Sequence, residues 1–553
     1  MVLVLAAAGC VSQLKPAAGL VAPGAWSASP VVQTEYGLLQ GAADQEGTWA
    51  WKGIHYAAPP IGELRWKAPR PPQPWQGVRQ ANRFGSSSAQ VVPIVGRSGS
   101  EDSLYLNVWR PKSAEGMLPV YVFVHGGGNT IGSSDLHDYY GYAVAARSNM
   151  VYVSLNYRLA LFGWFRLPAL SEGESPIDAS GNYGTLDIIA ALRWVKENIA
   201  AFGGDPSRVT LSGESAGAFN VLSLMVSPQA EGLFQRAVVE SGIAVMQSTA
   251  AAERAARTVA LKLLVSRGKA KDLQGAETVL RAMSNAEVRA FLYSVPTGAL
   301  LRTLDKSPVG LGMADWPTIY PDGSVLPAEG FTAFQDGTYP NKVPLIIGTN
   351  KDEEKLFLFS SKLYRQDPAL YDSLSAYRTA VWRYGGVDSV ARGITSQDGH
   401  PPVYSYRFDW GSPNAHGVSP LPGDLGRRLG AFHSTEIPFF LGTGTNAVSF
   451  LTGRFFTQAN EPGRKALTDA AMRYLAAFAR TGNPNDTTGA PLPAWEPWDP
   501  ADGGFKALVM DVDGTSLAFS VLRDAPTLES IKAQAPASGG NGADMGLLGA
   551  VGP

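Results

Sequence analysis

Short apolar runs rich in β-branched and aromatic residues recur along the chain, and such runs predict buried strands. Between two of them lies "TLDIIAALRWVKENIAAFGG" (185–204), whose apolar residues are spaced by three and four and which ends at Gly203 and Gly204, a normal helix stop. Strands that alternate with helical segments predict an α/β fold with a large, mostly parallel central sheet flanked by helices. The strand candidates are 104–109, 119–125, 150–157, 208–213, 236–241, 343–349 and 403–410.

The pattern divides the chain into three parts. Residues 30–528 form one predicted α/β domain. Within it, residues 250–335 are helical and are interpreted as an insertion over one end of the sheet. Residues 1–25 form an N-terminal segment with a linker. Residues 530–553 are poor in core-forming side chains, so we expect a flexible C-terminal tail.

Composition removes several functional classes. The net charge of −2 gives no electrostatic basis for binding nucleic acid. Cys10 is the single cysteine, so the chain has no internal disulfide and no site built from several thiolates. The six histidines are scattered without metal-ligand spacing. We therefore expect no metal site and no cofactor.

The first residues, "MVLVLAAAGCVSQLK", resemble the end of an export signal, with an apolar run leading to small residues. "AAAGC" also resembles a bacterial lipobox, in which the cysteine is lipidated, so Cys10 is a candidate lipid anchor. The alternative is an unstructured apolar terminus with an incidental cysteine. The prediction is an exported protein, periplasmic, membrane-anchored or secreted.

Candidate chemistry begins at "RVTLSGESAGAFNVLSLM" (208–225). "GESAG" matches G-x-S-x-G, in which a serine occupies a sharp turn between a strand and a helix. The flanking pattern agrees, because an apolar strand precedes Ser215 and a helix-forming segment follows it. The alternative is an ordinary turn serine between two glycines.

A serine nucleophile needs a base, and it also needs donors for the charge that develops on the attacked carbonyl oxygen. "VYVFVHGGGNTIG" (120–132) supplies donors, since a strand leads into three glycines whose amides can approach a substrate closely. We assign this oxyanion hole to the N–H groups of Gly127, Gly128 and Ala216. A flexible glycine turn is the alternative.

These motifs, with others in the same order, resemble the type-B carboxylesterases and cholinesterases, a family with the α/β-hydrolase fold, and among them a bacterial-type carboxylesterase. The resemblance extends over about residues 30–525. The segments that carry it are "WKGIHYAAPPIGELRWKAPRPP" (51–72), "SEDSLYLNVWRP" (100–111), "HGGG" (125–128), "LNYRLALFGWF" (155–165), "GNYGTLDIIAALRWVKENIAAFGGDPSRVTLSGESAG" (181–217), "GTNKDE" (348–353) and "FHSTEIPFFLG" (432–442).

The resemblance implies a catalytic triad of Ser215 as nucleophile, Glu353 as acid and His433 as base. By position alone Asp352 and Glu354 compete with Glu353, and only the motif chooses between them. His433 is also favoured among the late histidines, because His400 and His416 lie in loop-like segments where a solvated side chain is expected.

Several positions depart from the family pattern. Ser88 and Ser103 stand where many relatives have a disulfide, and the loop between them lacks the tryptophan that cholinesterases use to hold a quaternary ammonium. Asn129 replaces a common aromatic residue and is expected to make the pocket more polar. Glu214 matches a family acid that tunes the site, its alternative being a buried, hydrogen-bonded carboxylate.

The predicted function is therefore a serine hydrolase that cleaves small carboxylic esters through an acyl-enzyme intermediate. An amidase, carbamate hydrolase or lactonase with the same triad is one alternative, and an interfacial lipase is another. A non-catalytic recognition protein is the alternative from a different class, although it should lack a triad member. Trp316 and Trp382 are interpreted as core residues rather than as lining of the substrate gorge.

Overall fold

The structure of the chain is a computed structural model, which describes residues 22–93, 95–307, 311, 313–414, 416–444, 452–486 and 488–535. Cys10 and the predicted export signal lie outside the described residues, as do residues 536–553 of the predicted tail. None of the helices in the described part is both long enough and apolar enough to cross a membrane.

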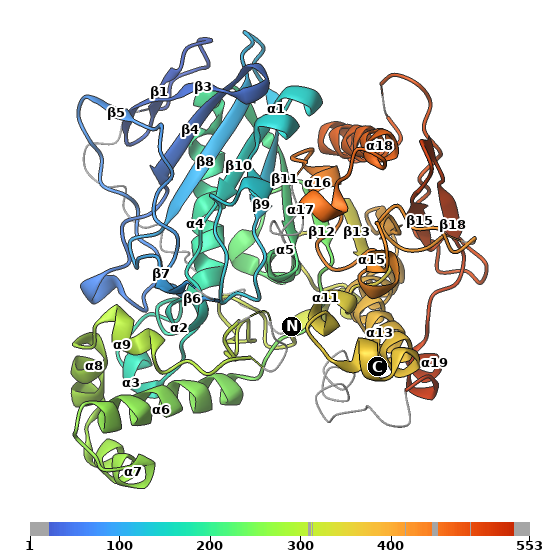
Figure 1. Cartoon of the computed structure of the whole chain (residues 1–553). Helices are drawn as coiled ribbons and strands as arrows, with labels where there is room; N and C mark the ends of the chain where they lie inside the picture. The colour runs from blue at the N-terminus through green and yellow to red at the C-terminus, as the bar shows by residue number, and fades with distance from the viewer. Residues whose placement is uncertain are drawn as a thin grey trace, which may run out of the picture.

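A sheet of eleven strands runs through the molecule in the order β18-β15-β14-β13-β12-β11-β9-β10-β8-β4-β3 (Figure 1). The pairs from β10 through β15 are parallel, and the outer pairs at both ends are antiparallel. The strands are β3 (Ala42–Asp44), β4 (Thr48–His55), β8 (Tyr105–Pro111), β9 (Leu118–Val124), β10 (Val151–Leu155), β11 (Gly204–Glu214), β12 (Arg236–Glu240), β13 (Leu345–Asn350), β14 (Val403–Phe408), β15 (Ala507–Met510) and β18 (Ser520–Leu522).

Short strands pair outside this sheet. They are β1 (Val31–Thr34), β2 (Gly37–Gln40) and β5 (Val78–Gln80) in one sheet, the hairpin β6 (Gln90–Val92) with β7 (Gly96–Ser98), and the hairpin β16 (Val512–Asp513) with β17 (Ser516–Leu517).

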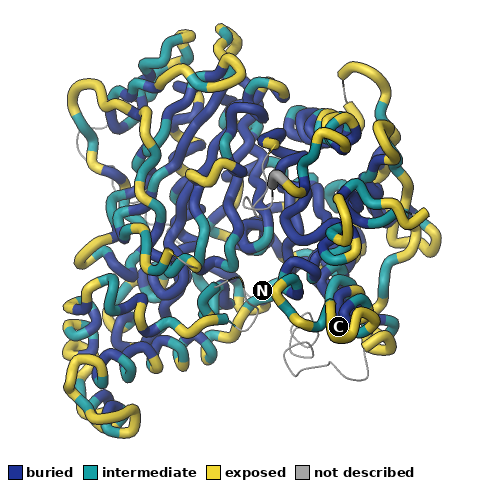
Figure 2. Tube along the Cα trace, in the orientation of Figure 1, coloured by how far each residue is buried: buried dark blue, intermediate teal, exposed yellow. Residues whose placement is uncertain are grey.

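Helices cover both faces of the large sheet, and the strand sequences show why. In β9 every residue is buried, and alternate side chains enter different cores. Val120, Val122 and Val124 belong to the core shared with α4 (Tyr183–Asn198) and α5 (Ala216–Val226), whereas Tyr121 and Phe123 belong to the core shared with α18 (Glu461–Thr481). The central strands are largely buried (Figure 2). Strands buried on both faces are continuous apolar runs, which is the pattern of the sequence.

The longer helices are α1 (Tyr142–Ser148), α4 (Tyr183–Asn198), α5 (Ala216–Val226), α6 (Thr249–Ser266), α7 (Leu273–Ala282), α8 (Asn285–Tyr293), α13 (Pro368–Arg383), α14 (Ser389–Thr395) and α18 (Glu461–Thr481). Shorter ones are α2 (Ala160–Gly163), α3 (Pro168–Ser171), α9 (Thr297–Leu301), α10 (Ala333–Asp336), α11 (Lys355–Leu358), α12 (Leu363–Gln366), α15 (Leu425–Arg428), α16 (Ile437–Phe440), α17 (Thr452–Phe455) and α19 (Leu528–Ala533). The predicted insertion forms α6 to α10, and α6 to α9 lie below the left part of the sheet in Figure 1.

The C-terminal segment stays ordered further than the predicted tail boundary at residue 530. That boundary falls inside α19, where Ile531 is fully buried against Tyr377, Val381 and Tyr384. An apolar side chain in "TLESIKA" is therefore packed on α13.

Candidate active site

Ser215 sits between the end of β11 and the start of α5, as the motif predicts. Its backbone has φ 55° and ψ −123°, which is unfavourable for a residue with a side chain. The backbone is held there because Ser215 N–H donates to the Glu240 carbonyl at 2.9 Å and the Ser215 carbonyl accepts from Phe219 N–H at 3.0 Å. The strained turn leaves Ser215 partly exposed on an otherwise buried segment.

The two glycines of the motif are required by close packing. A Cβ at Gly217 would lie 2.0 Å from the Val124 carbonyl oxygen at the end of β9, and one at Gly213 would lie 2.5 Å from Gly217. Both distances are too short for a real side chain, so the strand–helix turn can form only with glycine at these positions.

The predicted oxyanion loop follows β9. Gly127 and Gly128 have φ values of 106° and 61°, and a Cβ at Gly127 would meet the Ile131 carbonyl oxygen at 2.2 Å. Within the described residues none of the N–H groups of Gly127, Gly128 and Ala216 donates a hydrogen bond. They can therefore serve as donors to a substrate oxygen.

His125 and Tyr157 hold this loop in place. The Tyr157 hydroxyl donates to the His125 carbonyl at 2.9 Å, and the two rings stack at 4.6 Å. Burial lowers the pKa of His125 to about 4, so its ring is neutral at pH 7. His125 supports the loop instead of supplying a base.

Glu353 and His433 are brought together from distant parts of the chain. Glu353 follows β13, is fully buried, and lies with Oε2 2.6 Å from His433 Nδ1. Its other oxygen accepts a hydrogen bond from Asn350 N–H at 2.7 Å. Of the three acids in "KDEE", this is the one beside the imidazole, because Asp352 pairs with Lys355 and Glu354 faces Arg378.

The other side of the imidazole faces the strand–helix turn that holds Ser215. His433 Nε2 lies 3.2 Å from Oε1 of Glu214, the residue before Ser215, and makes no hydrogen bond within the described residues. A Cβ placed on Gly126 would lie 2.6 Å from Glu214 Oε2 and 3.1 Å from Ser215 Cβ, so both side chains border the oxyanion loop. The structure thus has no Nε2–Ser215 hydrogen bond, and such bonds are often loose or misaligned in unliganded hydrolases.

Sequence reasoning missed a second group of polar residues behind the imidazole. Glu436 is fully buried and accepts hydrogen bonds of 2.5 Å from Ser241 Oγ and from Asn350 Nδ2. Asn350 therefore links Glu436 to Glu353 through one residue. The available signal was a glutamate inside the apolar stretch "TEIPFF", since a carboxylate in such a stretch must be paired or protonated.

Three carboxylates surround one imidazole, and this raises the pKa of the imidazole. Burial alone would lower the pKa of His433, but the charges of Glu214, Glu353 and Glu436 raise it to about 9. Burial and the neighbouring carboxylates raise the pKa of Glu436 to about 8. The site thus retains protons that the same groups would lose in water near neutral pH.

Comparison with known proteins identifies the family of the chain. A family model described as "Carboxylesterase family" matches residues 28–377 and 366–515. The chain belongs to the carboxylesterase family. It is a carboxylic ester hydrolase with the α/β-hydrolase fold, and a serine nucleophile is typical of that family.

Individual relatives of this carboxylesterase cover most of its length. It is 34% identical over 486 residues to a para-nitrobenzyl esterase of Bacillus subtilis, covering 82% of this chain and 90% of the relative. It is 30% identical to a phenmedipham hydrolase of Pseudarthrobacter oxydans, covering 89% and 97%. The solved carboxylesterase EST55 of Geobacillus stearothermophilus superimposes with a TM-score of 0.70 at 30% identity, covering 91% and 99%.

Aromatic rings form one wall of the esterase's site. Trp382 and Phe357 lie with ring centroids 4.8 and 5.3 Å from that of His433, and Phe219 of α5 lies 6.5 Å from Trp382. Trp382 is buried, as the core interpretation requires, yet it packs directly on the imidazole. Trp316 is partly buried, stacks on Phe165 and donates its indole N–H to the Trp164 carbonyl.

The departures from the family pattern have physical counterparts in this carboxylesterase. Ser88 and Ser103, which stand at the positions of the disulfide that the resemblance implies for many family members, have buried hydroxyls joined by a hydrogen bond of 2.9 Å. Asn129 is buried, its Oδ1 accepts from Tyr157 and Asn220, and its Nδ2 donates to Thr318. Its amide thus ties the oxyanion loop to its surroundings.

Proposed function

We propose that this esterase hydrolyses uncharged carboxylic esters through an acyl-enzyme on Ser215, with His433 as general base and Glu353 as the acid that orients it. The observation that carries the proposal is the fully buried Glu353–His433 contact of 2.6 Å, with the second imidazole nitrogen directed toward the residue next to Ser215. Gly127, Gly128 and Ala216 are the proposed oxyanion donors.

The reaction runs in two steps with one proton relay. His433 Nε2 accepts the Ser215 proton as Oγ forms a bond to the ester carbonyl carbon, and the oxyanion accepts hydrogen bonds from the three amides. His433 then gives that proton to the departing alcohol as the ester bond breaks. In the second step His433 deprotonates water, the water oxygen bonds to the acyl carbon, and Ser215 leaves with the proton.

The aromatic wall sets the proposed substrate class. Phe357 beside the imidazole and Phe219 beside Trp382 are only partly buried, and Trp382 completes an apolar surface next to the reacting atoms. Such a surface favours an apolar or aromatic group on the ester by burial of area and by ring stacking. A para-nitrobenzyl ester, after which the Bacillus subtilis relative is named, is therefore a suitable first probe.

Replacing the nucleophile tests the proposal. Ser215→Ala should lower kcat for a para-nitrobenzyl ester by about 10⁶-fold, the size seen when a serine nucleophile is removed from a triad hydrolase. Ser223→Ala is the matched control, because that hydroxyl belongs to the same helix and bonds the Phe219 carbonyl. Retention of most activity in Ser215→Ala would show that another group attacks the ester.

The amidase, carbamate hydrolase and lactonase alternatives depend on the leaving group. A matched ester and amide with the same acyl part should differ strongly in kcat/KM, with the ester preferred. Equal values for both would make the narrower description as an esterase wrong.

The export and lipidation prediction is a separate proposal that rests on the sequence "MVLVLAAAGC" alone. Fractionation of cells that express the full chain should place the esterase outside the cytoplasm. Cys10→Ala should release it from the membrane fraction if the cysteine carries the anchor, and an unchanged distribution would exclude that role.

A further inference from the structure

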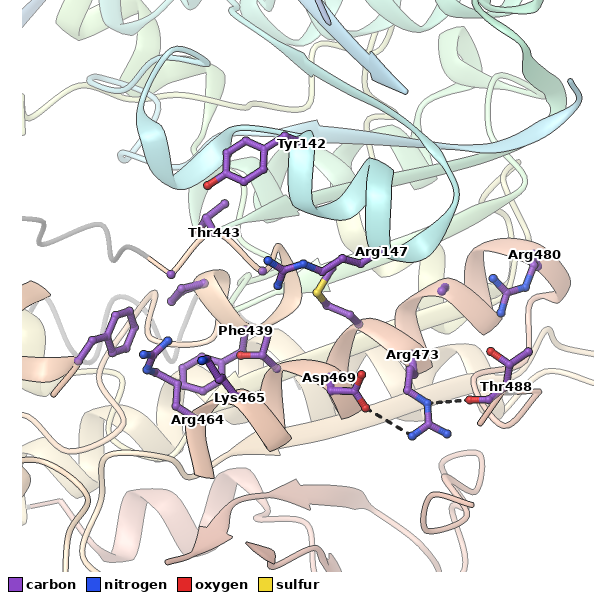
Figure 3. A pocket seen from close by; sticks show the side chains of 17 residues that line it. Tyr142, Arg147, Phe439, Thr443, Arg464, Lys465, Asp469, Arg473, Arg480 and Thr488 are labelled. Carbon is purple, nitrogen blue, oxygen red and sulfur yellow. Dashed lines mark hydrogen bonds and ion pairs between the residues drawn. The ribbon is translucent and has the colours of Figure 1, made fainter. Parts of the chain in front are cut away.

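A pocket of about 510 Å³ lies away from the strand–helix turn at Ser215, between α1, α16 and one side of α18 (Figure 3). Pro438 and Phe439 of α16 line it, and α16 begins four residues after His433. The volume is in the range of small-molecule sites, roughly 300–1,000 Å³. No step of the ester hydrolysis described above uses this pocket.

The charges around the pocket are unbalanced. Its described lining carries one acid, Asp469, against a set of cations: Arg147, Arg464, Lys465, Arg473 and Arg480. Three of these cations have carboxylate partners, namely Glu46 for Arg147, Glu461 for Lys465 and Asp469 for Arg473. Arg464 and Arg480 form no ion pair within the described residues.

Two polar groups in the lining are buried and lack partners. Thr443 is 7% exposed, and its hydroxyl makes no hydrogen bond with any described residue. Arg464 Nε is likewise buried without a partner, and burial lowers the pKa of this guanidinium. A buried polar atom without a partner costs free energy, which an oxygen of a bound ligand would recover.

The remaining lining is elongated and combines apolar side chains with the hydroxyls of Tyr142, Thr468 and Thr488. Phe439, Met472 and Ala476 line the pocket between its ends, and Arg464 and Arg480 are sixteen residues apart on one helix, about 24 Å at 1.5 Å per residue. Figure 3 shows Arg464, Lys465 and Thr443 toward one end and Arg473 and Arg480 toward the other. The pocket therefore has cations toward both ends and apolar side chains between them, and its two unpartnered polar groups, on Arg464 and Thr443, lie toward the same end.

We propose that this pocket binds an alkyl carboxylate, with the carboxylate at Arg464 and Thr443 and the alkyl chain along Met472 and Ala476. A guanidinium suits a carboxylate because it donates in a planar fork, and the Thr443 hydroxyl is a further donor in the same lining. Ester hydrolysis itself releases carboxylic acids, so the reaction generates ligands of this class. This inference uses the family's activity but not the assignment of Ser215.

Equilibrium binding of octanoate, measured by calorimetry, tests the proposal. The active site is first filled by inactivating the enzyme with an organophosphate, so that binding of octanoate as a product does not interfere. One octanoate should bind per chain, with 1-octanol, acetate and inorganic phosphate each binding at least about tenfold more weakly. Equal binding of octanol, or of acetate or phosphate, would overturn the proposed pairing of charge and chain.

Variants locate the site. Arg464→Gln should weaken octanoate binding about tenfold or more, and Thr443→Val should weaken it several-fold. Arg302→Gln removes the same charge from an exposed position on another part of the surface and should leave binding unchanged. Both variants should be folded by circular dichroism, and identical affinities in Arg464→Gln and Arg302→Gln would then show that octanoate binds elsewhere. A lack of octanoate binding to the inactivated enzyme would also overturn the proposal.

Discussion

Two buried charge clusters in this esterase differ in balance. Arg158 and Asp187 form a closed pair, with guanidinium–carboxylate bonds of 2.7 and 2.8 Å and a third bond from the Arg158 N–H at 3.0 Å. His433 instead shares its buried surroundings with three carboxylates, those of Glu214, Glu353 and Glu436. One cluster pairs one cation with one anion, whereas the other holds more acids than bases.

The difference in balance separates structural from chemical roles. In the closed pair, burial lowers the pKa of Arg158, but the charge of Asp187 raises it by more. The guanidinium therefore stays charged and joins the loop after β10 to α4. In the open cluster the excess of carboxylates raises the pKa of His433 to about 9, and burial with the neighbouring carboxylates raises the pKa of Glu436 to about 8. Changing one member of each cluster should therefore affect different properties.

The largest expected effect is on activity. Glu353→Gln keeps an oxygen for the Asn350 N–H but removes the charge that orients and stabilises the imidazolium, so kcat for a para-nitrobenzyl ester should fall by about 10⁴-fold. The midpoint of thermal unfolding should change little, because one of several repelling carboxylates is removed. A variant that loses stability as well as activity would assign Glu353 to the same structural class as Asp187.

The next largest effect is on stability. Asp187→Asn leaves the buried Arg158 without a counter-charge and should lower the free energy of unfolding by about 3–5 kcal/mol, measured by urea denaturation. Asp372→Asn is the control, because its bond to Arg427 at 2.8 Å lies on the surface and should contribute about 0–1 kcal/mol. KM of the folded Asp187→Asn enzyme should be unchanged, and a large change in KM would give the closed pair a role in the site.

The sequence predicted one part of this picture well. The central strands are found where apolar runs predicted them, as in β9 and β12, because strands buried on both faces leave an unbroken apolar pattern. The strands next to the two edges, β4 and β15, were missed. "TWAWKGIH" in β4 mixes buried and half-buried positions around a bulge, and β15 is only four residues long.

The same division applies to the site. Ser215, Glu353 and His433 lie in sequence motifs that can be recognised locally. In the motif of Ser215 the pattern has a steric cause, because Gly213 and Gly217 pack on Val124. The partnership of Glu436 with Ser241 and Asn350 joins three segments that no local pattern connects. The position of each carboxylate around the His433 imidazole depends on how the strands are arranged in the folded sheet, and the local sequence does not determine it.

The smallest expected effect is a shift in pH dependence that isolates one carboxylate of the open cluster. The raised pKa of His433, about 9, means that the base is mostly protonated at pH 7, so kcat/KM should rise with pH through about 9. Glu214→Gln removes one charge that favours the imidazolium, while its amide oxygen can still accept from the Ser434 hydroxyl. The pKa of His433 should then fall toward its ordinary value, and the acid limb of the profile should move to lower pH.

The direction of that shift is what distinguishes the two clusters. At pH 7 a larger fraction of Glu214→Gln should hold a neutral imidazole, so its kcat/KM relative to its own alkaline plateau should exceed that of the native enzyme. Glu231→Gln changes the net charge equally at an exposed position and should leave the profile in place. An acid limb that stays put or moves to higher pH in Glu214→Gln would show that Glu214 does not hold the imidazole in its charged form, and the carboxylate excess around His433 would then lack the chemical role inferred from its geometry.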